Sequence, residues 1–221
     1  MTVPDAVETF AEIIGPPADD VIREMDARAA ETGFPTVGPA VGGWLQQLAG
    51  LVGAERVFEF GSGFGYSAYW FARALPADGE IVLTEIDEDE LTDAREYLAR
   101  GGFDTTARFE LGDAIGIVES YDGPFDVVLI DNEKDRYVEA LEAVRGKLPA
   151  GSVVVADNMT AGPFEFEEIR RLVVDGETGG NADDERVCGV ADYLEHVVDD
   201  DALETTLLPL GEGLAVSRRV A

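Results

Sequence analysis

The stretch Arg56–Ser67, which reads RVFEFGSGFGYS, places a short apolar run directly before three closely spaced glycines. An apolar run of this length that ends in glycine is typical of a buried strand, and the residues after it follow a helical pattern. Glycines at such a turn let the backbone approach a ligand closely, and the next helix presents free N–H groups to it. The stretch predicts a ligand-binding strand-to-helix turn, although a tight turn without a ligand would look the same.

The alternation of strand and helix continues along the chain. We expect parallel strands at 56–60, 80–86, 107–111, 125–131 and 152–157, and helices between them at 66–75, 88–100, 114–119 and 134–148. Five such units predict an α/β fold with a mostly parallel sheet and helices on both faces. We further expect a helical N-terminal extension (1–52, broken at 15–17), a Gly-rich acidic loop at 175–185, a helix at 187–198 and closing strands at 204–208 and 213–218. Together these make one domain, 1–221, with a core at 53–221 and seven strands.

The composition is strongly acidic. Asp and Glu number 46 against 16 Lys and Arg, which gives a formal net charge of −30, and the only lysines are Lys134 and Lys147. Nucleic acids and anionic membranes are bound by clustered basic side chains, so both partners are disfavoured. Excess acid with few lysines is typical of proteins from a high-salt cytoplasm, where salt screens the self-repulsion. No apolar run reaches membrane-spanning length, and we expect a cytoplasmic protein.

Glu85 adds to the first site. It ends the second strand, 20 residues after Gly65, where a carboxylate can accept both hydroxyls of a ribose. A solvated acid at a strand end is the alternative. Together, the turn and this acid favour a ligand that contains adenosine.

Oxygen-bearing side chains end the fourth and fifth strands. Asp131 follows one, and Asp157 and Asn158 follow the other, so neighbouring parallel strands should bring them into one crevice. Two carboxylates and an amide suit a hard cation such as Mg²⁺, and a chain with one Cys and one His has few other metal ligands. Helix caps or solvated loop acids are the alternatives.

Lys134 lies three residues after Asp131. A cation at the start of a helix is unfavourable by about 0.3–1 kcal/mol, so its position has a cost that function would explain. A nearby Mg²⁺ would destabilise its ammonium and make the neutral amine available as a general base. A salt bridge to Asp131 or Glu133 is the alternative.

The pattern E-x-G-x-G-x-G, formed by Glu59, Gly61, Gly63 and Gly65, differs from the G-x-G-x-x-G of dinucleotide-binding proteins. It resembles the nucleotide motif of class I S-adenosylmethionine-dependent methyltransferases, which have a Rossmann-like fold. The resemblance implies that Glu59 helps hold the amino acid end of the cofactor and that Glu85 binds its ribose. The turn at 112–114 would border the adenine.

The residues Asp131, Lys134-Asp135-Arg136-Tyr137 and Asp157-Asn158 resemble the metal-dependent catechol O-methyltransferase and caffeoyl-CoA O-methyltransferase family. Residues 34–38, 65–68 and 207–214 resemble its cofactor lid, its helix start and its closing strand pair. The resemblance implies Mg²⁺ or another divalent cation on Asp131, Asp157 and Asn158, with Lys134 as the base. The implied cofactor-binding residues are Val37, Glu59, Gly61, Gly63, Gly65, Tyr66, Ser67, Glu85, Ile86, Asp113, Ala114 and Asp131.

The expected activity is methyl transfer from S-adenosylmethionine to one hydroxyl of a catechol-like vicinal diol. Two departures concern the substrate: Asn132-Glu133 replaces the His-Trp of the animal catechol enzymes, and Arg136 replaces the usual Asn of plant and bacterial members. One alternative is methylation of a hydroxyuridine in tRNA, which the lack of a basic patch disfavours. Another is a nonenzymatic S-adenosylmethionine-binding protein. A homodimer is expected from the resemblance alone.

Overall fold

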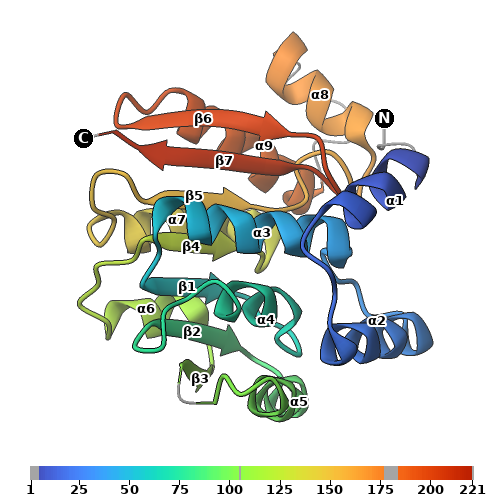
Figure 1. Ribbon diagram of the computed structural model, residues 1–221. Helices are drawn as coiled ribbons and strands as arrows, with labels where there is room; N and C mark the ends of the chain where they lie inside the picture. Colours follow the sequence, from blue (N-terminus) through green and yellow to red (C-terminus); the bar gives the residue numbers. More distant parts are fainter. Residues whose placement is uncertain (1–4, 105, 177–183, 221) are drawn as a thin grey trace.

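A seven-stranded sheet with the order β3-β2-β1-β4-β5-β7-β6 runs through the protein (Figure 1). The computed structural model describes residues 5–104, 106–176 and 184–220. Strands β1 to β5 pair in parallel, whereas β7 is antiparallel to both β5 and β6. The strands are β1 (Arg56–Phe60), β2 (Glu80–Glu85), β3 (Ala107–Leu111), β4 (Val127–Ile130), β5 (Val153–Ala156), β6 (Leu203–Leu208) and β7 (Leu214–Arg219). The predicted mostly parallel sheet of seven strands is confirmed.

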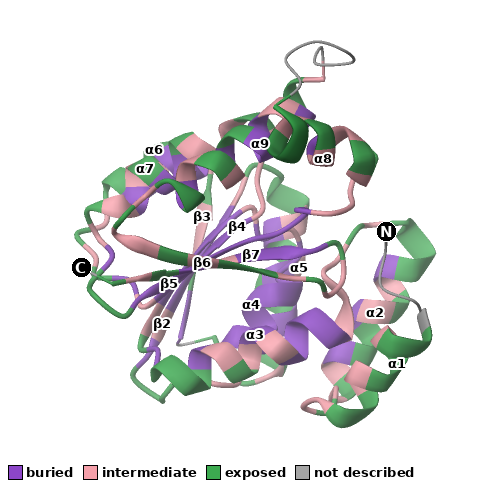
Figure 2. Ribbon diagram, turned by 90° about the horizontal axis from the view of Figure 1, so that it is seen from above, coloured by how far each residue is buried: buried purple, intermediate pink, exposed green. Residues whose placement is uncertain are grey.

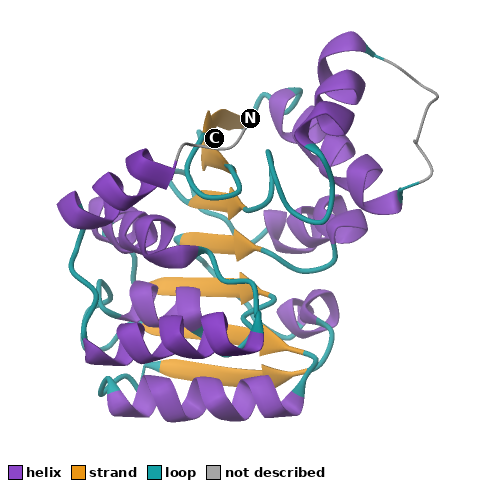
Figure 3. Ribbon diagram, turned by 90° about the vertical axis from the view of Figure 1, so that its right-hand side faces the viewer, coloured by secondary structure: helices purple, strands orange, loops and turns teal. Residues whose placement is uncertain are grey.

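Helices cover both faces of this sheet (Figures 2 and 3). Helices α3, α4 and α5 pack on one face, and α6, α7 and α9 pack on the other. The helices are α1 (Asp5–Ile14), α2 (Asp20–Thr32), α3 (Gly38–Val52), α4 (Tyr66–Ala72), α5 (Glu88–Arg100), α6 (Ala114–Glu119), α7 (Tyr137–Arg145), α8 (Phe166–Asp175) and α9 (Glu185–Val198). Helices α1 and α2 lie beyond the carboxyl ends of the parallel strands (Figure 1).

Two details differ from the prediction, and one expectation is not tested. The helix expected at 134–148 begins as a short 3-10 helix, η1 (Lys134–Arg136), and becomes α-helical only at Tyr137. Helix α8 was not expected. Most of the loop expected at 175–185 lies outside the described residues, since 177–183 are not described. Among the described helices, none combines the length and apolarity needed to cross a membrane.

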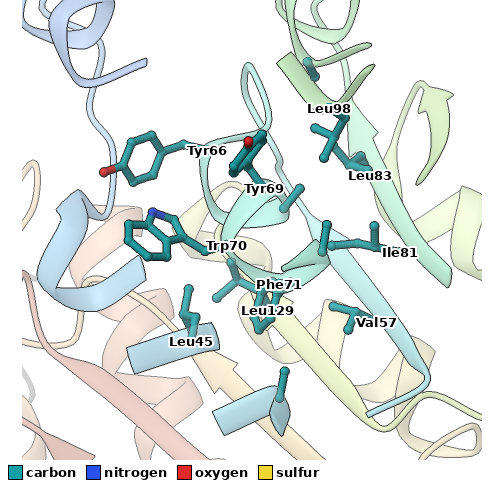
Figure 4. Close-up of a cluster of buried hydrophobic side chains, with 14 of the residues drawn as sticks. Leu45, Val57, Tyr66, Tyr69, Trp70, Phe71, Ile81, Leu83, Leu98 and Leu129 are labelled. Atoms are coloured by element: carbon teal, nitrogen blue, oxygen red, sulfur yellow. The ribbon is translucent and has the colours of Figure 1, made fainter. Parts of the chain in front are cut away.

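Helix α4 is the most deeply buried helix of the fold. All seven of its residues are buried between α3 and the sheet. Figure 4 shows Trp70 and Phe71 among Leu45 of α3 and the strand residues Val57 and Leu129. Burying one such large side chain contributes about 1.5–3 kcal/mol. The turn that leads into α4 is therefore held on a rigid base.

Strand register sets the position of the residues that follow β4 and β5. Both strands are buried along their whole length, as their continuous apolar runs predict. Ile130 pairs with Phe60 of β1 and with Ala156 of β5, so these strands end side by side. The next residues, Asp131 and Asp157, continue the ladder by donating their N–H groups to Phe60 O and Ile130 O, at 2.9 and 3.2 Å. The two acids therefore lie together at the carboxyl edge of the sheet.

Candidate active site

The turn after β1 requires glycine for its shape. Gly61, Gly63 and Gly65 have φ values of 80°, 49° and 82°, a region that other residues rarely adopt. Space is also limited: a Cβ on Gly61 would lie 2.7 Å from the carbonyl oxygen of Asp131, and one on Gly63 would lie 2.7 Å from the ring of Phe34. The turn therefore lies close to the end of β4 on one side and to Phe34, in the segment before α3, on the other.

A cavity of about 210 Å³ opens over this turn. It brings together many of the residues that the sequence predicts for cofactor, metal and catalysis. The predicted residues that line it are Val37, Gly61, Gly63, Tyr66, Ser67, Glu85, Asp131, Lys134, Asp157 and Asn158.

A second cavity of about 230 Å³ adjoins the first and shares Gly61, Glu85 and Asp131 with it. The other predicted residues in its lining are Ile86, Asp113 and Ala114. Glu59 and Gly65 line neither of these two cavities. Gly65 instead starts α4 and packs against α5.

The carboxylate of Glu85 lies between the two cavities. Its Oε2 accepts the N–H of Gly63 at 2.8 Å, and its Oε1 accepts the N–H groups of Ile86 and Asp87 at 2.8 and 3.1 Å. These bonds hold the carboxylate at the end of β2, where it faces the glycine turn. A carboxylate has about four acceptor sites, and these three bonds leave one of them, on Oε2, for a ligand hydroxyl.

Asp113 and Arg136 face each other in the second cavity. The Asp113 oxygens accept hydrogen bonds from Nη1 and Nη2 of Arg136, each at 3.1 Å, and Oδ1 also caps α6 by accepting the N–H of Ile115. The Arg136 guanidinium lowers the pKa of the Asp113 carboxyl. This ion pair joins the loop after β3 to the segment after β4.

Glu59 lies beneath the glycine turn and is fully buried. Neither of its carboxyl oxygens makes a hydrogen bond of regular geometry among the described residues, although the Ser67 side chain lies near enough to lower its pKa. Burial raises the pKa of Glu59 to about 8, with a smaller contribution from the charge of Asp131. Burying an acid without a regular hydrogen bond costs free energy, so packing alone does not explain an acid at this position.

The predicted metal ligands meet at the ends of β4 and β5. Asp157 is buried, and its Oδ1 accepts the N–H of Asn158 at 2.7 Å. Burial, followed by the charge of Asp131, raises the pKa of Asp157 to about 8, and burial also raises the pKa of Asp131. Asn158 has a φ of 66°, the only positive value of a residue other than glycine in the described part of the chain. Such strain often marks functional sites.

Two carboxylates and one amide make up this set. Among the described residues, no group of three or more His, Cys, Asp or Glu side chains has the geometry of a metal site. The predicted set contains only two side chains of these types, and its third member is the amide of Asn158.

Lys134 points into the same cavity from η1. Its Nζ lies 2.7 Å from Oδ1 of Asp131 and 5.1 Å from the ring centroid of Tyr137. The salt bridge to Asp131 that the sequence left as an alternative is therefore present. Behind the pair, the buried Tyr137 hydroxyl donates to the Asp157 carbonyl oxygen at 3.3 Å and lies 3.5 Å from Asp131 Oδ1.

The N-terminal extension covers the turn through hydrogen bonds to α4. Tyr66 lines the first cavity, but its hydroxyl donates to Asp26 of α2 at 2.6 Å. The hydroxyl of Tyr69 donates to Asp19 at 2.9 Å. Two tyrosines of the helix after the glycine turn thus anchor α2, which precedes residues 34–38.

Glu212 also lines the first cavity, and the sequence did not predict it as a site residue. It lies between two glycines in the turn from β6 to β7, and it accepts a hydrogen bond from Nδ2 of Asn158. The available signal was an acid within the closing-strand segment at 207–214. The place of that turn depends on the insertion of β7 beside β5, which the sequence alone does not reveal.

Comparisons of the sequence and of the structure with known proteins point to the same kind of protein. The sequence profile of one family, described as O-methyltransferase, matches residues 19–220. A catechol O-methyltransferase from Niastella koreensis is 37% identical over 148 residues, which are 64% of this chain and 66% of that protein, slightly less than two thirds of its length.

Solved structures resemble the whole chain. The O-methyltransferase TomG from Streptomyces achromogenes, which is involved in tomaymycin synthesis and was solved in complex with SAM, has a TM-score of 0.84 and 25% identity, and the match covers 98% of this chain and 96% of TomG. An O-methyltransferase from Bacillus cereus in complex with SAH has a TM-score of 0.82 and 24% identity, with 97% of each chain covered, and shares the fold.

Proposed function

Because this chain belongs to the O-methyltransferase family, we propose that it transfers a methyl group from S-adenosylmethionine (SAM) to one hydroxyl of a catechol-like vicinal diol, with a divalent cation such as Mg²⁺. The Rossmann-like methyltransferase fold that the sequence predicts is confirmed. The observation that carries the proposal is that two carboxylates, an amide and a lysine share the cavity over the glycine turn. The likeness to a catechol O-methyltransferase supports the substrate class.

The cofactor would occupy the two adjoining cavities. Glu85 lies where both cavities meet and would accept the ribose hydroxyls, and Asp113 would face the adenine. Glu59 lines neither cavity, so its proposed role toward the ammonium of the methionine moiety rests on the family resemblance and on its buried carboxyl, which makes no regular hydrogen bond. The solved SAM complex of TomG supports the choice of cofactor.

Asp131, Asp157 and Asn158 would hold the cation. The fit follows from their chemistry: burial raises the pKa of both acids, the charge of Asp131 raises that of Asp157 further, and a cation between them would offset these effects. Oxygen donors of this kind are those that Mg²⁺ prefers. When bound, the cation would chelate both hydroxyls of the diol and lower the pKa of the reacting one.

Lys134 would remove the proton from the reacting hydroxyl. Its Nζ reaches the same cavity, and Tyr137 and Asp131 restrict where the side chain can lie. A positioned general base contributes typically 10²–10⁴-fold to the rate. The lid segment and the glycine turn enclose the cavity and would hold the methyl donor beside the acceptor oxygen, an arrangement that favours reaction by positioning.

Methyl-transfer profiling tests this proposal. The purified protein is incubated in high-salt buffer with SAM and one acceptor at a time, chosen from catechols, hydroxycinnamoyl thioesters and tRNA, and the products are identified by mass spectrometry. Each reaction is run with Mg²⁺, with EDTA, and with EDTA followed by excess Mg²⁺. We expect one methylated hydroxyl per diol with Mg²⁺, no product in EDTA, and recovery after Mg²⁺ is restored.

Three results would contradict separate parts of the proposal. Full activity in EDTA would remove the metal. Transfer to tRNA without transfer to any diol would replace the substrate class. Binding of SAM without transfer to any acceptor would indicate a nonenzymatic role.

A further inference from the structure

The carboxylate of Glu212 lies beside the proposed metal site. Glu212 belongs to a different element from the proposed metal ligands, which follow β4 and β5. Glu212 lies in the turn between β6 and β7, and it lines the cavity together with Asp131, Lys134, Asp157 and Asn158. The Nδ2 of Asn158 donates a hydrogen bond to its Oε2. One predicted metal ligand is therefore in direct contact with a carboxylate that has no other role in the proposed reaction.

The backbone holds this contact in place. The carbonyl oxygen of Glu212 accepts the N–H groups of Thr160 and Ala161 at 2.8 and 3.0 Å and the hydroxyl of Thr160 at 3.0 Å. The next carbonyl, of Gly213, accepts the N–H of Met159 at 2.9 Å. Gly213 has a φ of +86°, and a Cβ there would collide with Thr160. The turn and the loop after β5 therefore form one hydrogen-bonded unit.

The chemistry of this contact determines which way the side-chain amide of Asn158 is turned. An ionised carboxylate only accepts hydrogen bonds, whereas an amide has an NH₂ group that donates and an oxygen that accepts. Because Glu212 is a carboxylate, the amide must turn its NH₂ toward it, which leaves Oδ1 free for another partner. Metal ions bind the amide through oxygen, and an amide turned the other way would offer them only N–H groups.

We propose that Glu212 is a positioning residue of the metal centre, which fixes the amide of Asn158 so that Oδ1 serves as the third metal ligand. The inference rests on the metal-dependent function proposed above. Hydrogen-bond partners of this kind orient the ligands of metal sites, and their mutation typically costs about 10–100-fold in metal affinity or activity. The positive φ of Asn158 is consistent with a side chain that must be aimed.

The first test compares Glu212→Gln with Glu204→Gln. Glu204 lies on β6 and pairs with Arg218 on the surface, so its variant removes the same charge from the same strand pair, away from the cavity. Gln at position 212 keeps the size of the side chain but can also donate, so it no longer dictates the direction of the amide. We measure the dissociation constant of Mn²⁺ from the intact protein by electron paramagnetic resonance, SAH binding by calorimetry, and thermal unfolding.

We expect Mn²⁺ to bind Glu212→Gln about 10–100-fold more weakly than wild type, whereas Glu204→Gln binds as wild type and both variants keep the wild-type affinity for SAH. An unchanged Mn²⁺ affinity in Glu212→Gln, or an equal loss in both variants, overturns the inference. Failure of the wild-type protein to bind Mn²⁺ overturns the metal-dependent function itself, so the two failures are distinguishable.

The second test separates orientation from charge. In Asn158→Asp, either carboxylate oxygen can bind the metal, so the direction of the side chain no longer matters. If Glu212 acts by orienting Asn158, adding Glu212→Gln to Asn158→Asp causes no further loss of Mn²⁺ affinity. A loss as large as in the wild-type background means that Glu212 acts as a charge or as a ligand itself, which overturns the inference.

Discussion

The ammonium nitrogen of Lys134 lies 2.7 Å from Oδ1 of Asp131. The proposed base is thus paired with a proposed metal ligand, and the lysine side chain is only 14% exposed. An ammonium has no lone pair and cannot accept a proton, so the lysine must lose a proton before Lys134 can act on a hydroxyl. The charged lysine that pairs with Asp131 and the neutral lysine that could act as a base are thus two protonation states of one side chain.

Replacing Lys134 by Arg separates these two roles. Arg keeps the positive charge and can pair with Asp131, but it stays protonated in proteins and cannot serve as a base. We therefore expect both Lys134→Arg and Lys134→Ala to lower kcat by about 10²–10⁴-fold. The measurements are kcat with a diol acceptor and SAH affinity, which should change little because neither variant removes a predicted cofactor contact. Activity of Lys134→Arg close to wild type would assign the lysine a purely electrostatic role.

The buried carboxyl of Glu59 makes the stability of the ligand-free protein depend on pH. Its pKa is about 8 in the folded protein, against an ordinary value near 4.5, so between these pH values the folded state binds more protons than the unfolded state. Stability is therefore greatest at the acidic end of this range and falls as pH rises toward 8. Asp157 has a raised pKa near the same value and contributes in the same direction.

We expect Glu59→Gln to unfold at a higher temperature than wild type at pH 8, because the neutral amide avoids the burial of a charge, and to show a much smaller gain at pH 5. The full effect is on the order of a few kcal/mol. Thermal unfolding at both pH values, without cofactor, gives the comparison. The same variant should bind SAM more weakly, since it lacks the carboxylate proposed to face the ammonium. A gain that is equal at both pH values would show that titration of Glu59 is not its source.

The sequence predicts well those contacts that depend on neighbouring parallel strands. Apolar runs without alternation identify β4 and β5, and parallel strands that are adjacent must end at the same edge. The meeting of Asp131 with Asp157 follows from those two facts, although 26 residues separate them. The glycines are equally predictable, because Gly61 and Gly63 have backbone conformations and contacts that other residues do not tolerate.

Contacts that depend on strand order could not be predicted. Glu212 reaches Asn158 only because β7 inserts antiparallel beside β5, and no local pattern reveals that choice. The Arg136–Asp113 pair joins two different loops and has no sequence signature. Helix α8 is a different case: a capping box of Glu165 and Glu168 opens an amphipathic run, so the signal was present in the sequence and the prediction missed it.

The Arg136–Asp113 pair offers a test of the adenine side of the site. Both side chains are partly exposed, so their ion pair contributes about 0.2–1 kcal/mol. Without Arg136, the side chain of Asp113 is no longer held in the position where we propose that it faces the adenine. We expect Arg136→Asn to weaken SAH binding by about two- to fivefold by calorimetry. Arg170→Asn is the control, because the ion pairs that Arg170 forms with described residues, Glu167 and Asp175, lie on the surface of α8. An equal change in both variants would attribute the effect to net charge.

The position of Lys134 depends on close contact between η1 and α9. Gly189 of α9 faces that segment, and a Cβ at this position would collide with backbone atoms of Lys134 and Asp135. Backbone atoms cannot move aside as a flexible side chain does, so Gly189→Ala should cost about 1–3 kcal/mol and displace Lys134 from the cavity. Gly116 of α6 is the matched control, because a Cβ there meets nothing within 4 Å and alanine favours the helix.

Urea denaturation and kcat measurements compare the two variants. Gly189→Ala should lower the unfolding free energy and kcat, whereas Gly116→Ala should leave the unfolding free energy equal or higher and kcat unchanged. If Gly189→Ala is as stable and as active as Gly116→Ala, the contact with α9 does not set the place of the lysine.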